Sequence, residues 1–296
     1  MNNTQYVVVN GMNNILMQST NHCEKVSIRS CAKPFQVLPV CLMGLDDKYN
    51  LSLPEIAIMS SSMLAQDIHV KTIQGLLSTL RIRIDDLSLV PTAPYGRIAY
   101  LNWQHEKREK SPIYNPCIGN HIAMYLAQRE LTGNGNDYLS PSSPVQKMIL
   151  EIIQELCKCR SNETIIGIDH CGSPCYSMPL KSLALGYRSL CINELDVNER
   201  YITAILKIRK AFFRFPRYLE GDGCLSTIIS RCEGLVGKTG ANGTIGIGID
   251  KYRCGVAIYS ADRNWSAIAE TITTIMERLG CNNRRLYREL LRVATV

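Results

Sequence analysis

The stretch Arg29-Ser30-Cys31-Ala32-Lys33-Pro34 contains the pattern Ser-x-x-Lys directly before a proline. Proline is favoured in the first turn of a helix, so the stretch predicts a helix that runs roughly from residue 34 to Gly44. One helical turn can bring Ser30 and Lys33 side by side. A serine hydroxyl needs a neighbouring base before it becomes a good nucleophile, and a desolvated lysine can be that base. The stretch therefore predicts a nucleophilic serine at the start of a helix.

A second lysine motif, Lys238-Thr239-Gly240, lies near the other end of the chain. The patterns Ser-x-x-Lys and Lys-Thr-Gly occur together in enzymes whose serine forms a covalent acyl intermediate. Each pattern is short, and a lone Ser-x-x-Lys is more often a helix start followed by a surface lysine. The glycines around Lys238 let a ligand approach the backbone closely. Together the two motifs predict a serine hydrolase.

Strand patterns occur at both ends of the chain. Residues 6–9 and 15–17 predict two strands joined by a turn at Asn10-Gly11. After about residue 225 the pattern turns to β again, and three further strands are predicted over residues 234–238, 244–249 and 254–259. A helix over residues 265–279 and a basic terminal helix follow them.

Helical periodicity dominates the middle of the chain. Ser52 and Glu55 have the spacing of a capping box at a helix start. Helices are predicted over residues 54–64, 67–80, 119–131, 144–157 and 179–188. We therefore expect a mixed α+β fold, with an antiparallel sheet built from both chain ends, flanked by helices, and a helical lobe inserted between them. The chain of 296 residues is expected to form one catalytic domain, with a β-rich lobe from about 1–50 and 220–296 and a helical middle lobe of about 51–219.

The charge, hydropathy and cysteine content of the chain indicate which partners to expect and where in the cell the protein is located. The formal net charge of +7 is mild for this length, and the arginines near the C-terminus fit the solvated face of a helix better than a nucleic-acid site. No stretch approaches the roughly 18 apolar residues of a membrane span, and the N-terminus lacks a signal-peptide pattern. The 13 cysteines in such a chain predict reduced thiols and a cytoplasmic protein.

Several motifs resemble those of one known family. The residues from Arg29 to Gln36, RSCAKPFQ, resemble the R-S-A-A-K-P-x-Q signature of the rhizobial-type asparaginase II family. Further matches follow in the same order as in that family: Met59–Ser62, Asn115–His121, Tyr138–Gln146, Gly167–Pro174 and Leu235–Ala241. The resemblance covers nearly the whole chain. It implies a fold similar to that of serine β-lactamases and penicillin-binding proteins, and a homodimer.

The resemblance also implies roles for individual residues. Ser30 would be the nucleophile and Lys33 its base, and Ser62 would relay a proton between the two lysines. Lys238 would lie opposite, favouring the neutral form of Lys33 by like-charge repulsion. Asp169 would hold the amino group of the substrate.

The implied reaction is acylation of Ser30 by a side-chain amide, with loss of ammonia, followed by hydrolysis. Thr239 and Gly240 of the second motif are expected beside the substrate. Backbone N–H groups at the start of the helix after Ser30 are one source of the donors that the tetrahedral oxyanion needs. This chemistry requires no cofactor.

The metal site of the family is altered in this chain. The family holds zinc with two cysteines that match Cys117 and Cys171, together with a lysine whose position is occupied here by Asn120. An asparagine oxygen is a poor zinc ligand beside two thiolates. His121 and His170 are the candidates for a replacement ligand, and buried core thiols are the alternative to a zinc site.

Other departures lie on the substrate side. Cys224 stands where the resemblance predicts an arginine in a G-x-G-R-x-x-T pattern, which indicates an altered specificity. We expect a Ser/Lys amidohydrolase acting on asparagine or a related small or peptidyl amide. One alternative is an acyltransferase, which the apolar residues Met63, Leu64 and Ile118 would favour at a dry site. A second alternative is a catalytically silent relative that binds a ligand or partner.

Overall fold

Isoleucine and glycine alternate along the strand β7 (Thr244–Ile249), and each face of the strand meets a different set of helices. In the computed structural model, which describes residues 4–20, 25–191 and 197–294, the isoleucines pack into a cluster with the helices near the C-terminus. The glycines face α9 (Leu180–Ser189), where a Cβ on Gly246 would lie 2.1 Å from the ring of Tyr187. Glycine is therefore required on this face because the helix approaches the backbone of the strand directly.

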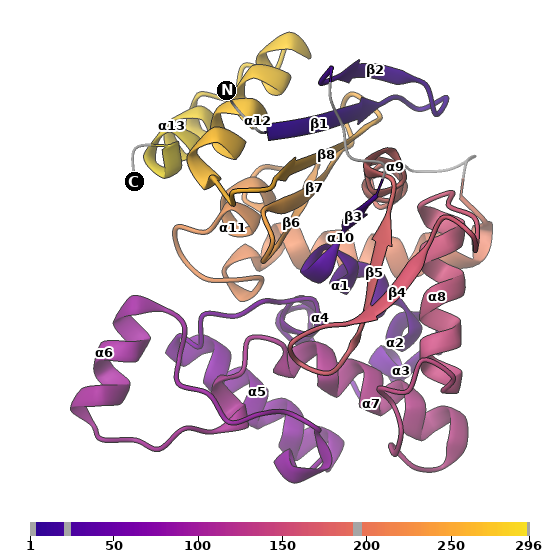
Figure 1. Cartoon of the computed structure of the whole chain (residues 1–296). Helices are drawn as coiled ribbons and strands as arrows, with labels where there is room; N and C mark the ends of the chain where they lie inside the picture. Colours follow the sequence, from indigo (N-terminus) through magenta and orange to yellow (C-terminus); the bar gives the residue numbers. More distant parts are fainter. Residues whose placement is uncertain (1–3, 21–24, 192–196, 295–296) are drawn as a thin grey trace.

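The main sheet is antiparallel and draws its strands from both ends of the chain (Figure 1). Its order is β2-β1-β8-β7-β6, and β1 pairs with β8 so that Tyr6 lies opposite Ile258. The bounds of its other strands are β1 (Thr4–Val9), β2 (Ile15–Gln18), β6 (Leu235–Gly240) and β8 (Cys254–Ser260). The predicted mixed α+β class and the antiparallel sheet built from both ends are confirmed.

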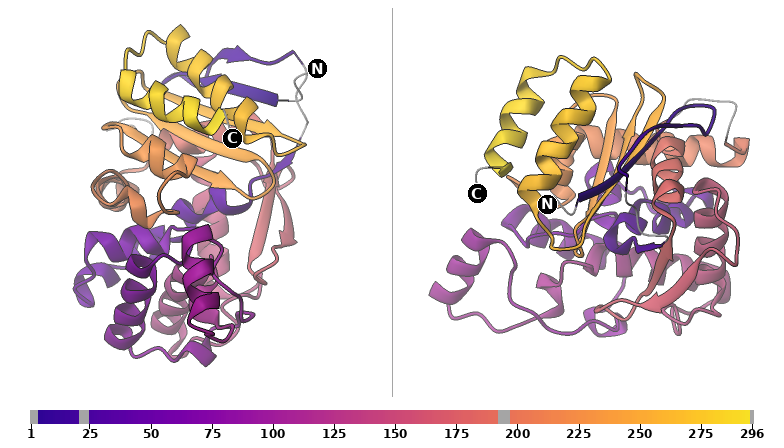
Figure 2. Two further views of the ribbon diagram at one scale, coloured as in Figure 1. Left: turned by 90° about the vertical axis from the view of Figure 1, so that its left-hand side faces the viewer. Right: turned by 45° about the horizontal axis from the view of Figure 1, so that its top comes forward.

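Helices cover both faces of this sheet (Figure 2). The side chains of β7 and β8 on one face form an apolar cluster with α11 (Leu225–Ser230), α12 (Trp265–Arg278) and α13 (Arg284–Ala294). The other face packs on α9, where a Cβ on Gly255 would lie 1.9 Å from the carbonyl oxygen of Ala184. Helix α9 also forms part of the second and larger apolar cluster, so it joins the sheet to the rest of the molecule.

The remaining elements lie mainly below the sheet in Figure 1. The α-helices are α1 (Lys33–Gln36), α2 (Leu38–Leu42), α3 (Leu45–Lys48), α4 (Leu53–Met59), α5 (Asp67–Leu80), α6 (Arg97–His105), α7 (Ile118–Thr132), α8 (Pro144–Leu156) and α10 (Ile202–Arg214). The short 3₁₀ helices are η1 (Arg29–Ala32), η2 (Ile84–Asp86), η3 (Pro112–Tyr114), η4 (Glu199–Tyr201) and η5 (Pro216–Tyr218). A small second sheet has the order β3-β5-β4, with β3 (Val26–Ser27), β4 (Ile165–Ile168) and β5 (Pro174–Met178).

Two predicted helices differ from the observed ones for local and tertiary reasons. The helix predicted to run from residue 34 is divided into α1 and α2, because Pro39 has no N–H to donate to the carbonyl of Phe35. The helix predicted over 54–64 ends at Met59, and the N–H of Ser62 donates to the carbonyl of Leu219 instead. The capping box of Ser52 and Glu55 is confirmed.

Other elements were not predicted at all. These are the helices α3, α6, α10 and α11, the short 3₁₀ helices η2 to η5 and the small sheet β3-β5-β4. Two of the strands, β4 and β5, lie within the region expected to be a helical lobe. Among the described residues, no helix combines the length and the hydropathy that would carry it across a bilayer.

Candidate active site

The segment that carries Ser30 is held between α9 and the strand β6. The hydroxyl of Tyr187 donates to the carbonyl oxygen of Cys31 at 2.9 Å, and the thiol of Cys31 donates to the carbonyl oxygen of Lys238 at 3.1 Å. At the end of β6, a Cβ on Gly240 would lie 2.9 Å from the carbonyl oxygen of Ile28. The two lysine motifs, far apart in the sequence, therefore lie against each other.

Ser30 lies on η1 and is partly exposed, and its hydroxyl makes no hydrogen bond with another described residue. The neighbouring thiol of Cys31 is fully buried, and this burial raises its pKa to about 12. Cys31 is therefore protonated at neutral pH and closed to solvent. The hydroxyl of Ser30 is the accessible nucleophilic group of this turn.

The side chain of Lys33 contacts two other predicted site residues, Ser62 and Cys117. This side chain is buried, and its Nζ donates to the carbonyl oxygen of Ser61 at 2.5 Å and to Ser62 Oγ at 3.2 Å. The Sγ of Cys117 lies 3.4 Å from the same nitrogen. The backbone N–H of Lys33 donates to the carbonyl oxygen of Ser30, but among the described contacts its Nζ makes no hydrogen bond with the Ser30 hydroxyl. The lysine faces the Ser61-Ser62 segment and the start of α7 instead.

Cys117 and Cys171 form a thiol pair beside this lysine. A hydrogen bond from Cys171 lowers the pKa of Cys117 to about 6, against the opposing effect of burial, and the charge of Lys33 acts in the same direction as the hydrogen bond. The pKa of Cys171 is raised, because its proton is held in the hydrogen bond to Cys117 and because it is buried. At neutral pH the pair therefore holds one proton and one negative charge, beside the Nζ of Lys33.

Among the described residues, no third zinc ligand accompanies the thiol pair. Zinc in proteins takes three or four Cys, His, Asp or Glu ligands in a tetrahedral arrangement. In the described part of the chain, no three such side chains are grouped closely enough to hold a metal ion. Asn120 is buried and its amide nitrogen has no hydrogen-bond partner among the described residues. The position of the expected lysine thus carries a neutral amide.

The two histidines considered as replacement ligands do not join the thiols. The Nδ1 of His121 lies 2.7 Å from the hydroxyl of Tyr138, and burial together with the charge of Lys33 lowers the pKa of His121 to about 3. The Nε2 of His121 has no hydrogen-bond partner among the described residues. His170 is exposed to solvent. Neither completes a metal site with Cys117 and Cys171 within the described ranges.

Lys238 is fully buried and is paired with a carboxylate that the sequence analysis missed. Its Nζ donates to Glu220 Oε1 at 2.7 Å and to the carbonyl oxygen of Thr239 at 3.1 Å. The hydroxyl of Thr239 donates to the same carboxylate oxygen. Glu220 compensates the charge of Lys238, which weakens the like-charge repulsion expected to act on Lys33. No local pattern marks Glu220, because its pairing with Lys238 exists only in the folded chain.

Asp169 is also paired. Its Oδ1 lies 2.7 Å from Nη2 of Arg29 and accepts a hydrogen bond from the backbone N–H of His170 at 2.6 Å. Arg29 has a positive φ of 46°, a backbone conformation that is uncommon outside glycine and that persists only where the surroundings enforce it. The carboxylate expected to hold the substrate's amino group therefore already binds the residue that precedes Ser30.

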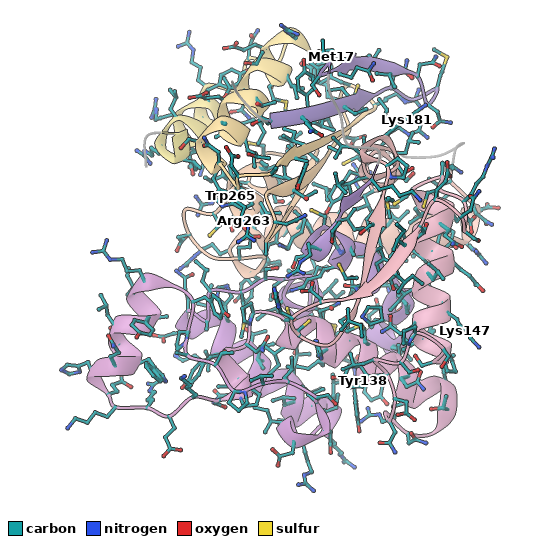
Figure 3. The ribbon with its side chains drawn as sticks, viewed as in Figure 1. Met17, Tyr138, Lys147, Lys181, Arg263 and Trp265 are labelled. Atoms are coloured by element: carbon teal, nitrogen blue, oxygen red, sulfur yellow. The ribbon has the colours of Figure 1, made fainter. Side chains whose placement is uncertain are left out.

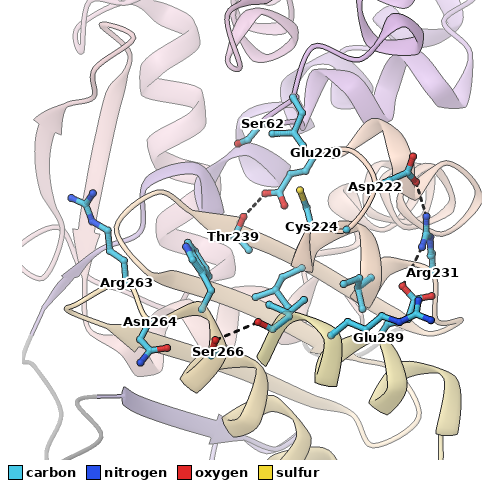
Figure 4. Close-up of a pocket in the computed structure, with 17 residues that line it drawn as sticks. Ser62, Glu220, Asp222, Cys224, Arg231, Thr239, Arg263, Asn264, Ser266 and Glu289 are labelled. Atoms are coloured by element: carbon cyan, nitrogen blue, oxygen red, sulfur yellow. Dashed lines mark hydrogen bonds and ion pairs between the residues drawn. The ribbon is translucent and has the colours of Figure 1, made fainter. Parts of the chain in front are cut away.

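A pocket of about 1030 Å³ lies beside Ser62, Glu220 and Thr239 (Figure 4). Ser62, Glu220 and Thr239 line one side of it, and residues from the start of α12 and the end of α13 line the opposite side. Cys224 also lines the pocket, and burial raises its pKa to about 12, so its thiol is neutral. Of the predicted site residues, the pocket thus includes Ser62 and Thr239.

Three comparisons with known proteins bear on this site. The family model described as L-asparaginase II matches the chain over residues 1–296. The chain is similar to a solved structure described as a novel penicillin-binding protein homolog from Caulobacter crescentus, with 12% sequence identity and a TM-score of 0.44. That match covers 87% of this chain and 86% of the other. No curated protein matches the chain.

Proposed function

Because the chain belongs to the L-asparaginase II family, we propose that it is a serine-dependent amidohydrolase that acylates Ser30 and releases ammonia from a side-chain amide. The observation that carries this proposal is the contact of 3.2 Å between the buried Lys33 and Ser62, one helical turn from the partly exposed Ser30. The fold brings the second lysine motif to the same place, through the bond between Cys31 and the carbonyl of Lys238.

The chemistry assigned to these groups is acyl transfer in two steps. In the first, Ser30 Oγ attacks the amide carbon and its proton passes, directly or through Ser62, to Lys33 in its neutral amine form; the amide nitrogen then takes up that proton and leaves as ammonia. In the second, water attacks the ester carbon, giving the carboxylic acid and restoring the serine hydroxyl. Each step passes through a tetrahedral intermediate with a negative oxygen.

Two backbone N–H groups are candidates to stabilise that oxygen. Neither the N–H of Ser30 nor that of Ala241, the residue after Gly240, donates a hydrogen bond to another described residue. Both lie where η1 meets the end of β6, which is the position that a pair of oxyanion donors would require. Lys238 connects the residues of this region. Its carbonyl oxygen accepts a hydrogen bond from Cys31, and its Nζ donates to Glu220 and to the carbonyl oxygen of Thr239.

The structure gives the acyltransferase alternative little support. Met63 and Ile118, two of the three residues considered for a dry site, are fully buried core residues, and only Leu64 lines the pocket. Hydrolysis therefore remains the proposed outcome for the acyl-enzyme. The cytoplasmic location and the homodimer stay expectations from the cysteine content and the family resemblance.

The test is ammonia release from a panel of amides that includes asparagine and glutamine. We expect release by the unaltered protein and its complete loss in Ser30→Ala, with Ser27→Ala as the matched control. Ser27 lies on the same segment, but its hydroxyl contacts Cys175, so Ser27→Ala is expected to retain activity. Equal release by Ser30→Ala and the unaltered protein would rule out the proposed mechanism. Adding an amine and analysing the products distinguishes hydrolysis from acyl transfer.

A further inference from the structure

The pocket beside Ser62 is large for a free amino acid. Pockets that bury most of a drug-sized ligand have volumes of about 300–1,000 Å³. The volume here, about 1030 Å³, slightly exceeds that range. The pocket beside Ser62 therefore has room for a ligand considerably larger than asparagine.

The acidic groups that line the pocket are all paired with cations. Glu220 binds Lys238, Asp222 binds Arg217 and Arg231, and Glu289 binds Arg231. Arg263 differs, since its exposed guanidinium forms no ion pair with any residue in the described part of the chain. In Figure 4, Arg263 lies at the opposite end of the pocket from the pair formed by Asp222 and Arg231.

Apolar side chains also line the pocket that Arg263 borders. Trp265, two residues further along, is partly buried and lies near Arg263 at the start of α12 (Figure 3). Leu225, Ile228 and Val293 continue the apolar lining of the pocket. A ligand that fills the pocket would thus place an apolar group on Trp265 and a negative group on Arg263 at the same time.

The position of Arg263 connects it to the catalytic segment. A Cβ on Gly243, in the turn between β6 and β7, would lie 3.1 Å from the Cα of Arg263. The same turn begins at Gly240, which packs against the carbonyl of Ile28 at the entry to η1. The backbone of Arg263 therefore packs against the turn whose first residue contacts the entry to η1.

We propose that the pocket selects a peptidyl amide, in which an asparagine-like residue is followed by an apolar residue with a free carboxylate. The side-chain amide would lie at Ser30, the apolar side chain on Trp265 and the carboxylate on Arg263. The inference rests on the proposed function for the chemistry of the amide, and it adds the class of substrate. An arginine and a carboxylate form a charge-assisted pair, and an aromatic wall binds an apolar side chain.

Binding can be measured without turnover in a Ser30→Ala background. The chain has two tryptophans, so Trp103→Phe leaves Trp265 as the only one, and its fluorescence reports ligand binding. The probes are asparaginyl-phenylalanine and asparaginyl-phenethylamine, which lacks the carboxylate. We expect the first probe to bind about tenfold more tightly, as a charge-assisted hydrogen bond predicts. Arg263→Gln should remove that difference.

The matched control is Arg278→Gln, which alters an exposed arginine at the far end of α12, the helix that begins two residues after Arg263. It should keep the tenfold difference between the two probes. The inference is wrong if both probes bind equally, or if the difference survives Arg263→Gln. Preferential binding of the acid that depends on Arg263 supports it.

Ammonia release by the protein with Ser30 intact distinguishes this inference from the proposed function. If the pattern of binding holds but neither asparaginyl-phenylalanine nor asparagine releases ammonia, the proposed function fails and the ligand class stands. If free asparagine is hydrolysed with a kcat/KM equal to or above that of asparaginyl-phenylalanine, the proposed function stands and the inference about the pocket is overturned.

Discussion

Among individual residues, Lys238 stands out because a single carboxylate compensates its buried charge. Lys238 is fully buried and Glu220 is its only acidic partner among the described residues. Breaking a buried ion pair by removing one partner leaves an uncompensated charge in the interior, which costs about 3–5 kcal/mol. We therefore expect Glu220→Gln to lower the free energy of unfolding by about 3 kcal/mol, measured by urea denaturation.

The control for this change is Asp222→Asn, two residues further along. Its ion pairs with Arg217 and Arg231 are partly exposed to solvent, and exposed pairs contribute about 0–1 kcal/mol. Asp222→Asn should therefore shift the unfolding curve only slightly. If both variants were equally stable, Glu220 would not be the group that compensates Lys238.

The metal content is a second prediction at the residue scale. Cys117 and Cys171 lie together, but the buried residue at the position of the expected lysine is Asn120, whose amide is a poor zinc ligand. We expect the purified protein to contain well below one zinc ion per chain, and a chelator to leave ammonia release unchanged. Elemental analysis checks the first point. One zinc per chain, lost together with activity on chelation, would contradict the prediction.

At the scale of elements, the contact between β7 and α9 positions the nucleophile. A Cβ on Gly246 would lie 2.1 Å from the ring of Tyr187, whose hydroxyl holds the carbonyl of Cys31. Gly246→Ala must therefore displace Tyr187 and with it η1. Overpacking of this kind typically costs about 1–3 kcal/mol, and we expect such a loss of stability together with reduced ammonia release.

The control is Gly75→Ala, for which we expect a gain in stability instead of a loss. Gly75 lies on the exposed side of α5, and a Cβ there would meet no atom within 4 Å. Because alanine is favoured over glycine in a helix interior, Gly75→Ala should stabilise the protein by about 0.8 kcal/mol without affecting activity. Thermal and urea unfolding of the two variants measure both effects. Equal stability of the two variants would contradict the packing argument.

At the scale of the whole molecule, stability is expected to depend on pH through His69. The Nδ1 of this buried side chain accepts the backbone N–H of Gln66 at 3.1 Å, and its Nε2 donates to the carbonyl of Arg217 at 2.8 Å. The imidazole thus links α5 to η5 in its neutral form. Burial lowers the pKa of His69 below its usual value, an effect that the nearby charge of Arg217 reinforces.

The direction of this pH dependence follows from how many protons the folded and the unfolded chain bind. Below a pH of about 6.5 the unfolded chain protonates this histidine while the folded chain does not, so the free energy of unfolding falls as the pH falls. The limiting slope for one proton is about 1.4 kcal/mol per pH unit. We expect His69→Gln to reduce the slope measured by urea denaturation between pH 6.5 and 5. The exposed His105→Gln should leave it unchanged, and an unaltered slope in His69→Gln would contradict the assignment.

Much of the fold follows from local patterns in the sequence. The strands β1, β2, β6, β7 and β8 and the helices α5, α7, α8 and α12 lie close to their predicted ranges, because alternation, periodicity and turn residues are properties of neighbouring positions. Gly133 ends α7 with a φ of 83°, as its place after Thr132 predicts. The small sheet β3-β5-β4 was missed because β3 has only two residues, and its pairing with β5 depends on contacts across the chain.

Local patterns in the chain predict the two lysine motifs, the family that they resemble and the β-rich ends that form one sheet. How the charges are compensated follows from the folded arrangement alone. The fold pairs Glu220 with Lys238, Arg29 with Asp169 and Cys117 with Lys33, and it places Arg263 beside the pocket without an ion-pair partner among the described residues. The physical reason is that electrostatic energy depends on distance and burial in space, which separation along the chain does not specify.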